Sequence, residues 1–194
     1  MITVEEAVAA ICSGGVVIVP TDTVYGLACD PANPAAIEAV YELKDRPPHL
    51  ELNLLAADVS QLDGLVEIGP TARTLVDAFW PGALALICPA GPRRLLIPRA
   101  GTSLMVRVPG HPLLRDLLRQ SGPVASTSAN RHGGPPPRTA EEALLMARPP
   151  CAGVVDGGPG SGMASTIIDL TSTPPRVLRE GPVPATALRR HLGG

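Results

Sequence analysis

Two hydroxyl side chains flank a carboxylate directly after a short apolar run. The run at positions 16–19 is entirely β-branched and leads through Pro20 into Thr21, Asp22 and Thr23. Such a run is typical of a strand that is buried on both faces. Open α/β sheets bind ligands at the carboxyl ends of such strands, which predicts a ligand site here. The alternative is a turn in which the same side chains bind local backbone groups.

A second apolar run also ends in small polar side chains. Positions 124 and 125 lead into Ser126, Thr127 and Ser128, and Asn130 follows two residues later. One polar strand end is ordinary. Two of them favour a cleft, because buried polar groups need a partner from the protein or from a ligand.

Three basic residues are candidates for binding an anion. Lys44 and Arg46 lie at the end of an expected helix, before two prolines. There they complement the helix dipole, or, if the last turn unravels, both reach one polyphosphate. Arg107 lies in the alternating segment 103–108, on the face opposite the apolar residues. On an inner sheet face it needs an anionic partner, whereas on an edge strand it is solvated.

Several common catalytic motifs are absent from the sequence. There is no GxxxxGK[ST], GxGxxG or GxSxG motif, no Cys–His nucleophile pair and no His/Cys/carboxylate cluster with metal-ligand spacing. Any chemistry is therefore expected to work by positioning and charge neutralisation, without a covalent intermediate.

Alternating helix and strand patterns place these groups in an α/β fold. Helix starts are marked by a capping-box pattern at Thr3 and Glu6 and by Asn33 before Pro34. His111 before Pro112 is interpreted as a helix cap. Helices are expected at 3–11, 33–43, 58–65, 71–79, 111–118, 139–147 and 184–192. Strands are expected at 16–19, 52–56, 83–88, 103–108, 154–156, 165–170 and 177–179, and from 124 onwards.

Composition limits the class of protein. The 194 residues are 45% hydrophobic, enough for one core, but only 2% aromatic, which disfavours a stacking platform for single-stranded nucleic acid. The net charge of -2 excludes a protein that is basic throughout. No signal peptide or apolar run of about 18 residues is present, so we expect no membrane span and a cytoplasmic protein. The cysteines are expected to be buried thiols: Cys12, Cys29, Cys88 and Cys151.

Seven short motifs occur in order through nearly the whole chain. They are Pro20-Thr21-Asp22-Thr23-Val24-Tyr25-Gly26-Leu27, Lys44-Asp45-Arg46-Pro47, Trp80-Pro81-Gly82 before Ala83-Leu84, Arg107-Val108-Pro109 with His111-Pro112, Ser128-Ala129-Asn130, Ser165-Thr166 with Asp169, and Leu178-Arg179 with Gly181. Together they resemble the motifs of the threonylcarbamoyl-AMP synthases, or YrdC-like proteins.

This resemblance implies an α/β fold with a twisted open mixed sheet, flanking helices and a concave basic cleft. It implies that residues 1–194 form a single YrdC-like domain, with no additional carboxyl-terminal domain. It also implies a nucleotidyltransferase that makes threonylcarbamoyl-adenylate and pyrophosphate from L-threonine, bicarbonate and ATP. Other proteins, the tRNA threonylcarbamoyl transferases, would then use the product.

The same resemblance implies the roles of individual residues. The catalytic residues would be Lys44, Arg46, Ser128 and Asn130. These four would also bind ATP, together with Ser103 and Arg179. Threonine would be held by Thr21, Thr23, Tyr25, Arg107, Ser126 and Ser165, with Arg107 taking the carboxylate bidentately. Mg²⁺ would accompany ATP, held mainly by phosphates and water, with no metal site on the protein.

The sequence departs from the family pattern at three positions. Glu51 lies where the family has a proline before leucine, and it adds a negative charge near the expected ATP. His132 and Pro136 replace serines after Asn130. Two other functions therefore remain open. One is a YrdC-like RNA-binding relative without synthase activity, binding tRNA or double-stranded RNA weakly. The other is a carbamoyl-handling domain with an acceptor other than threonine.

Overall fold

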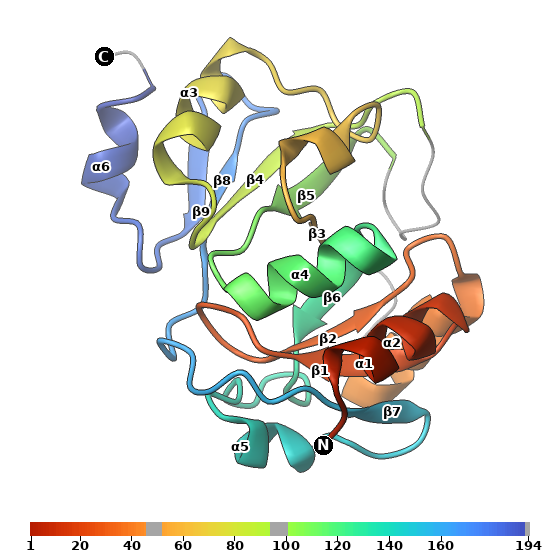
Figure 1. Ribbon diagram of the computed structural model, residues 1–194. Coiled ribbons are helices and arrows are strands. Elements are labelled where there is room, and N and C mark those ends of the chain that lie inside the picture. The colour runs from red at the N-terminus through yellow and green to blue at the C-terminus, as the bar shows by residue number, and fades with distance from the viewer. Residues whose placement is uncertain (46–51, 94–100, 193–194) are drawn as a thin grey trace.

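The computed structural model describes residues 1–45, 52–93 and 101–192. Within these residues, nine strands form one open mixed sheet in the order β7-β1-β2-β6-β3-β5-β4-β8-β9. Helices flank it (Figure 1), so the expected fold class is confirmed. Three residues named above lie outside the described residues: Arg46, Pro47 and Glu51.

The strands and helices follow the chain in order. The strands are β1 (Val16–Val19), β2 (Gly26–Cys29), β3 (Asn53–Leu55), β4 (Leu84–Pro89), β5 (Ser103–Arg107), β6 (Val124–Ser128), β7 (Cys151–Val154), β8 (Thr166–Asp169) and β9 (Arg176–Arg179). The helices are α1 (Val4–Cys12), α2 (Pro34–Lys44), α3 (Pro70–Phe79), α4 (Pro112–Ser121), α5 (Ala140–Leu144) and α6 (Ala185–Arg189), with a 3₁₀ turn, η1 (Val59–Leu62).

The sheet combines both strand orientations. The parallel pairs are β1–β7, β3–β5 and β4–β8. The antiparallel pairs are β1–β2, β2–β6, β3–β6, β4–β5 and β8–β9. Since several neighbours in the sheet are far apart in sequence, distant segments end beside one another.

Each face of the sheet packs against its own helices. One apolar cluster joins the sheet residues Leu54 and Leu86 to side chains of α2, α3, α5 and α6. The other joins Val17 and Leu55 to α1 and α4, which contact each other (Figure 1). Residues paired in register point to the same face, so Arg107 faces the α1/α4 side together with its partner Leu55. Part of this face forms the cavity described below.

The helix starts confirm the sequence signals. Thr3 Oγ1 accepts a hydrogen bond from Glu6 N at 3.2 Å, and Thr3 N donates to Glu6 Oε2 at 2.8 Å. The Asn33 side chain caps α2 by accepting from two backbone N–H groups. Such caps each stabilise a helix by about 1 kcal/mol.

Several expected elements differ in the structure. The helix expected at 58–65 is wrong: only η1 forms, and Gly64 follows with a φ of 73° that favours glycine. The strand expected at 154–156 lies at Cys151–Val154, because Asp156 leaves the ladder and accepts from Gly158 N at 2.9 Å. The strand β2 was not expected, and α5 ends earlier than position 147.

All four cysteines lie within the described residues and are free thiols. Cys29 and Cys88 are buried, as expected, and burial raises the pKa of each thiol to about 12. Cys12 is exposed, which corrects the expectation for that residue, and Cys151 is partly exposed. Over the described part of the chain, no helix has the length and apolar character needed to cross a bilayer.

A glycine-rich segment after β7 holds the turn between β1 and β2. Ser161 N donates to Asp22 O at 3.3 Å, and Gly162 N donates to Thr23 O at 2.8 Å. Gly160 lies so close that a Cβ there would come within 2.5 Å of Thr23 O and 3.2 Å of Thr21 O. The absence of a side chain at Gly160 therefore permits this contact.

The substitution Gly160→Ala tests this contact. The added methyl group must displace backbone, so we expect the free energy of unfolding to fall by about 1–3 kcal/mol. Gly69→Ala is the control, because a Cβ at Gly69 meets no atom within 4 Å. Gly69 is the N-cap of α3, where alanine is less favourable than glycine, so its effect should stay below about 1 kcal/mol. Denaturant unfolding measures both, and equal stability of the two variants would contradict the close packing of the two segments.

Candidate active site

A cavity of about 430 Å³ opens beside the turn between β1 and β2. Of the twelve residues that the sequence resemblance selects, nine line it: Thr21, Thr23, Tyr25, Arg107, Ser126, Ser128, Asn130, Ser165 and Arg179. They come from five separate segments of the chain. The two polar strand ends singled out in the sequence therefore meet in one cleft.

One face of the sheet forms the floor of this cavity. Neighbouring strands contribute side chains in register, so that Asn53 of β3 pairs with Ser126 of β6 and with Met105 of β5. Along the same strands, Leu55 pairs with Arg107. All five residues line the cavity, so the register of the central strands fixes its floor.

Arg107 is the most constrained charged group of the cavity. Its side chain is 4% exposed, and its Nη2 donates to Asp22 Oδ1 at 2.5 Å. Nη1 donates to Thr23 Oγ1 at 3.0 Å and also contacts Ser165 Oγ. Nε donates to Gly82 O at 2.8 Å. Three other segments of the chain therefore converge on one guanidinium group.

These contacts show whether Arg107 is solvated and limit how it could bind a carboxylate. Arg107 is not solvated at an edge, because β5 lies between β3 and β4. A guanidinium has five N–H donors, and the contacts above use four of them. A bidentate contact with a carboxylate would therefore require one of the present partners to move. The role of Arg107 as a threonine ligand stays a prediction.

The turn between β1 and β2 combines both interpretations drawn from its sequence. Thr21 Oγ1 accepts from Thr23 N at 3.0 Å and Val24 N at 3.1 Å, and donates to Val24 O at 2.7 Å. Thr21 thus closes the turn locally. Asp22 instead reaches outward, accepting from Gly110 N at 2.9 Å as well as from Arg107. The turn presents one hydroxyl group and one carboxylate to distant segments.

The wall of the cavity contains two guanidinium groups. Its lining, taken over the described residues, includes Arg107 and Arg179 and no Asp or Glu. Burial lowers the pKa of Arg107, Asp22 opposes that shift, and the charge of Arg179 adds to it. Burial also lowers the pKa of Arg179, whose Nε donates to Ser165 O at 2.8 Å. An anion between the two guanidinium groups would reduce their repulsion.

Lys44 lies beside the cavity without lining it. The residue is 1% exposed, and its Nζ donates to Ser128 O at 2.5 Å and Asn130 O at 2.6 Å. Asp45 follows in the left-handed region, with a φ of 52°, and ends α2. The ammonium group thus supports the backbone of two cavity residues. Arg46, predicted to act with it, lies outside the described residues.

Tyr25 directs its hydroxyl group toward the glycine-rich segment. The phenol donates to Gly158 O at 2.9 Å and accepts from Gly157 N at 3.2 Å. Burial raises the pKa of Tyr25, so the phenol is neutral at physiological pH. Tyr25 therefore joins the segment after β7 to the site.

The structure differs from what was expected for the side chains of Ser103 and His111. Ser103 begins β5 opposite Pro89 and is not among the residues that line the cavity; its role in ATP binding stays a prediction. His111 occupies the N-cap position of α4, but its side chain makes no cap hydrogen bond. Its Nε2 instead lies 3.1 Å from Gly157 O, so His111 is the N-cap residue as expected, but its side chain does not cap the helix.

Sequence reasoning missed some residues of the cavity. Asp22 was noticed in its motif but was not assigned to the site, although it pairs with Arg107. Asn53 was missed altogether; its signal was a single amide inside the apolar run of β3. Pro136, one of the departures from the family pattern, also lines the cavity, and His132 N donates to Lys44 O at 2.9 Å.

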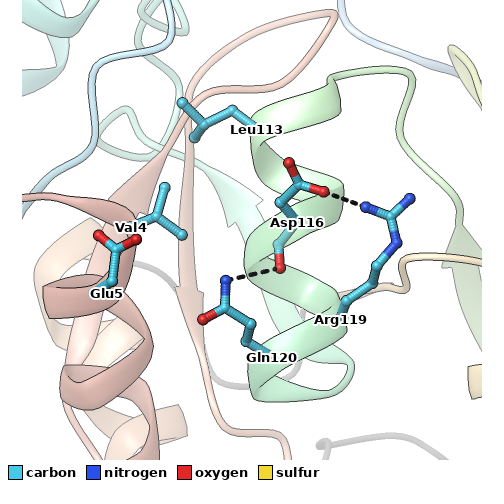
Figure 2. A pocket seen from close by; sticks show the side chains of 6 residues that line it. All are labelled: Val4, Glu5, Leu113, Asp116, Arg119 and Gln120. Atoms are coloured by element: carbon cyan, nitrogen blue, oxygen red, sulfur yellow. Dashed lines mark hydrogen bonds and ion pairs between the residues drawn. The ribbon is translucent and has the colours of Figure 1, made fainter.

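A second hollow lies between α1 and α4 (Figure 2). Its volume is about 570 Å³, and the exposed Asp116 in its wall pairs with Arg119 of the same helix. None of the buried polar atoms that lack a partner belongs to the residues lining it in the described structure. This hollow is therefore not the candidate active site. No group of three metal-ligating side chains is found in the described parts of the chain.

Known proteins share both the sequence and the fold. The Sua5/YciO/YrdC family model, described as "Telomere recombination", matches residues 9–181. Threonylcarbamoyl-AMP synthase of Stenotrophomonas maltophilia is 42% identical over 164 residues, covering 82% of this chain and 88% of that protein. The Bacillus subtilis threonylcarbamoyl-AMP synthase is 40% identical over 196 residues, covering 98% of this chain but 56% of that protein.

Solved structures agree with these relatives. P. abyssi Sua5 complexed with L-threonine matches with a TM-score of 0.91 and 34% identity, covering 98% of this chain and 57% of that one. E. coli YciO matches with a TM-score of 0.84 and 28% identity, covering 95% and 92%. The chain therefore belongs to the Sua5/YciO/YrdC family, which the seven motifs indicated.

Proposed function

We propose that this protein is a threonylcarbamoyl-AMP synthase, an enzyme that makes threonylcarbamoyl-adenylate and pyrophosphate from L-threonine, bicarbonate and ATP. One observation carries the proposal: nine motif residues from five segments meet in one cavity, whose described lining holds two guanidinium groups and no carboxylate. The synthases from S. maltophilia and B. subtilis, both about 40% identical, support it.

The main obstacle to this reaction is repulsion between anions. The amine of threonine adds to carbon dioxide with loss of a proton, or to bicarbonate with loss of water, and gives a carbamate. A carbamate oxygen then attacks the α-phosphorus of ATP, and pyrophosphate leaves with the electron pair of the broken P–O bond. Both reactants are negatively charged, so fixed cations favour their approach. Holding them aligned can remove about 7–11 kcal/mol of the barrier.

The cavity residues divide into two groups in this proposal. Thr21, Thr23, Tyr25, Arg107, Ser126 and Ser165 hold threonine. Lys44, Arg46, Ser103, Ser128, Asn130 and Arg179 hold ATP, and Lys44, Arg46, Ser128 and Asn130 are the catalytic residues among them. Mg²⁺ arrives with ATP as part of the substrate, coordinated mainly by phosphates and water. The chemistry of the cavity lining fits this view, because its described residues supply cations and hydroxyl groups instead of carboxylate ligands.

Other proteins would use the proposed product. Separate tRNA threonylcarbamoyl transferase proteins would move the threonylcarbamoyl group to tRNA, so this protein needs no tight tRNA site. A cytoplasmic location is part of the proposal, because ATP and tRNA are both present there.

Pyrophosphate release from ATP and bicarbonate tests the reaction. We expect release to depend on L-threonine, because the carbamate forms on its amine. Phosphate-coupled detection of pyrophosphate, with and without threonine, measures the dependence.

Two other results would replace the proposal. Release with a different amine acceptor and none with threonine would indicate another carbamoyl-handling enzyme. No release, together with salt-sensitive binding to duplex RNA, would indicate the RNA-binding function instead.

The substitution Lys44→Met tests the ammonium group beside the cavity. It keeps much of the side-chain volume but leaves the Ser128 and Asn130 carbonyl groups without this donor. We expect the turnover number to fall by about 10²–10³. Arg93→Met is the control, because Arg93 is exposed and its side chain contacts only Asp63 O, at 3.4 Å, among the recorded hydrogen bonds. Equal losses in both variants would contradict the role of Lys44.

The substitution Asp22→Asn tests the buried ion pair. Breaking such a pair leaves an uncompensated buried charge and commonly costs about 3–5 kcal/mol of stability. We expect a lower unfolding midpoint in denaturant and a higher KM for threonine. Asp116→Asn is the matched control, since the Asp116–Arg119 pair is at least half exposed and contributes about 0–1 kcal/mol. A variant of Asp22 with unchanged stability and unchanged KM would rule out this anchoring.

A further inference from the structure

Asn53 is the polar residue of the cavity floor for which the motifs provide no role. It lies on β3, between Leu52 and Leu54, which are both buried in the core. Its side-chain Oδ1 is buried and has no hydrogen-bond partner. Asparagine is depleted in strands, and an apolar side chain would leave no polar atom unpaired here. The residue therefore needs a reason beyond folding.

A buried acceptor without a donor is unfavourable, so it points to a ligand. Asn53 lines the 430 Å³ cavity and the residue is partly exposed, so a turn of its amide about χ2 presents Oδ1 to a bound molecule. The Oδ1 of Asn130, the other asparagine of the cavity, is likewise buried without a partner, but its Nδ2 donates to Arg131 O at 2.8 Å and Gly134 O at 2.7 Å and so fixes the amide. The Asn130 side chain thus has a structural function, whereas Asn53 has no recorded side-chain hydrogen bond.

The strand register indicates which part of the substrate Asn53 meets. Its direct partners across the sheet are Ser126 and Met105. The next residue on the same face of β3 is Leu55, paired with Arg107. Ser126 and Arg107 both belong to the group that holds threonine in the proposed function. Asn53 therefore lies within the amino-acid end of the cavity.

We propose that Asn53 determines specificity for the amino-acid substrate, its Oδ1 accepting a hydrogen bond from an N–H or O–H group of that amino acid. This inference rests on the proposed function. The acceptor selects ligands that carry a donor at this point, because a ligand without one leaves Oδ1 buried and unpaired.

The substitution Asn53→Leu removes the acceptor at similar side-chain volume. We expect the KM for threonine to rise at least tenfold while the KM for ATP changes less than twofold. Gln120→Leu, at an exposed position of the hollow between α1 and α4, is the control for the same amide-to-leucine change outside the cavity, and its KM for threonine should stay within threefold. Thermal unfolding of each variant checks that it is folded. An unchanged KM for threonine in Asn53→Leu, or equal rises for threonine and ATP, overturns the inference.

Threonine and 2-aminobutyrate, which lacks the hydroxyl group, distinguish the two donors. If Asn53 accepts from the hydroxyl group, the preference of the wild-type protein for threonine is lost in Asn53→Leu. If it accepts from the amine, the KM values for both amino acids rise and their ratio is kept. Either result supports the inference. If the KM rises for neither amino acid, the inference is contradicted.

Direct binding separates this inference from the proposed reaction. Calorimetric titration of L-threonine into the wild-type and Asn53→Leu proteins needs no turnover. If the wild-type protein binds threonine but releases no pyrophosphate, the proposed reaction fails, and at least tenfold weaker binding by the variant still supports the role of Asn53. If the wild-type protein turns over threonine and both proteins bind it equally, only the inference fails. Absence of threonine binding to the wild-type protein overturns both.

Discussion

A buried guanidinium group imposes the constraint on which the site depends. A cation removed from water must be paired and hydrogen-bonded. Otherwise the hydration free energy that it loses exceeds the stabilisation that contacts in the interior provide. Arg107 meets this requirement with Asp22 and Thr23 of one turn, Ser165 before β8, and the carbonyl of Gly82. No two of these three segments are adjacent in sequence. Satisfying one charge therefore brings them to fixed positions, and the same contacts form one wall of the cavity.

The same constraint separates the charged groups around the cavity of a protein whose net charge is -2. The lining concentrates two arginines over one sheet face, while the carboxylate that balances Arg107 approaches from the turn and is not among the lining residues. Burial strengthens the field of these groups, because less water screens them. The cavity wall thus carries two guanidinium groups although the chain as a whole has no excess of basic residues.

The sequence predicted the parts that depend on local signals. Thr3 and Asn33 cap their helices as the pattern indicated, and the apolar runs around Val17 and Leu86 form strands. The strand β2 was missed because its residues Gly, Leu, Ala and Cys lack β-branching; it forms through pairing with β1 and β6. The motifs identified nine residues that line one cavity. They did not reveal the partner of Arg107 or the unpaired amide of Asn53, because these depend on how the strands and turns are arranged in space. Register is a tertiary property that no short window of sequence reveals.

The strand order has a consequence for how the chain reaches its folded state. Ile18 pairs with Val154, and Leu84 with Thr166, so the sheet is completed only when late segments return to early ones. Chains dominated by such distant pairings fold more slowly than those built from local contacts, because loops must close before pairing compensates for the lost entropy. A sheet to which the segment from Ser165 to β9 has not yet been added lacks the cavity residues Ser165, Ile167 and Arg179. Ligands of this cavity therefore bind the completed molecule more tightly and shift the folding equilibrium toward it by mass action.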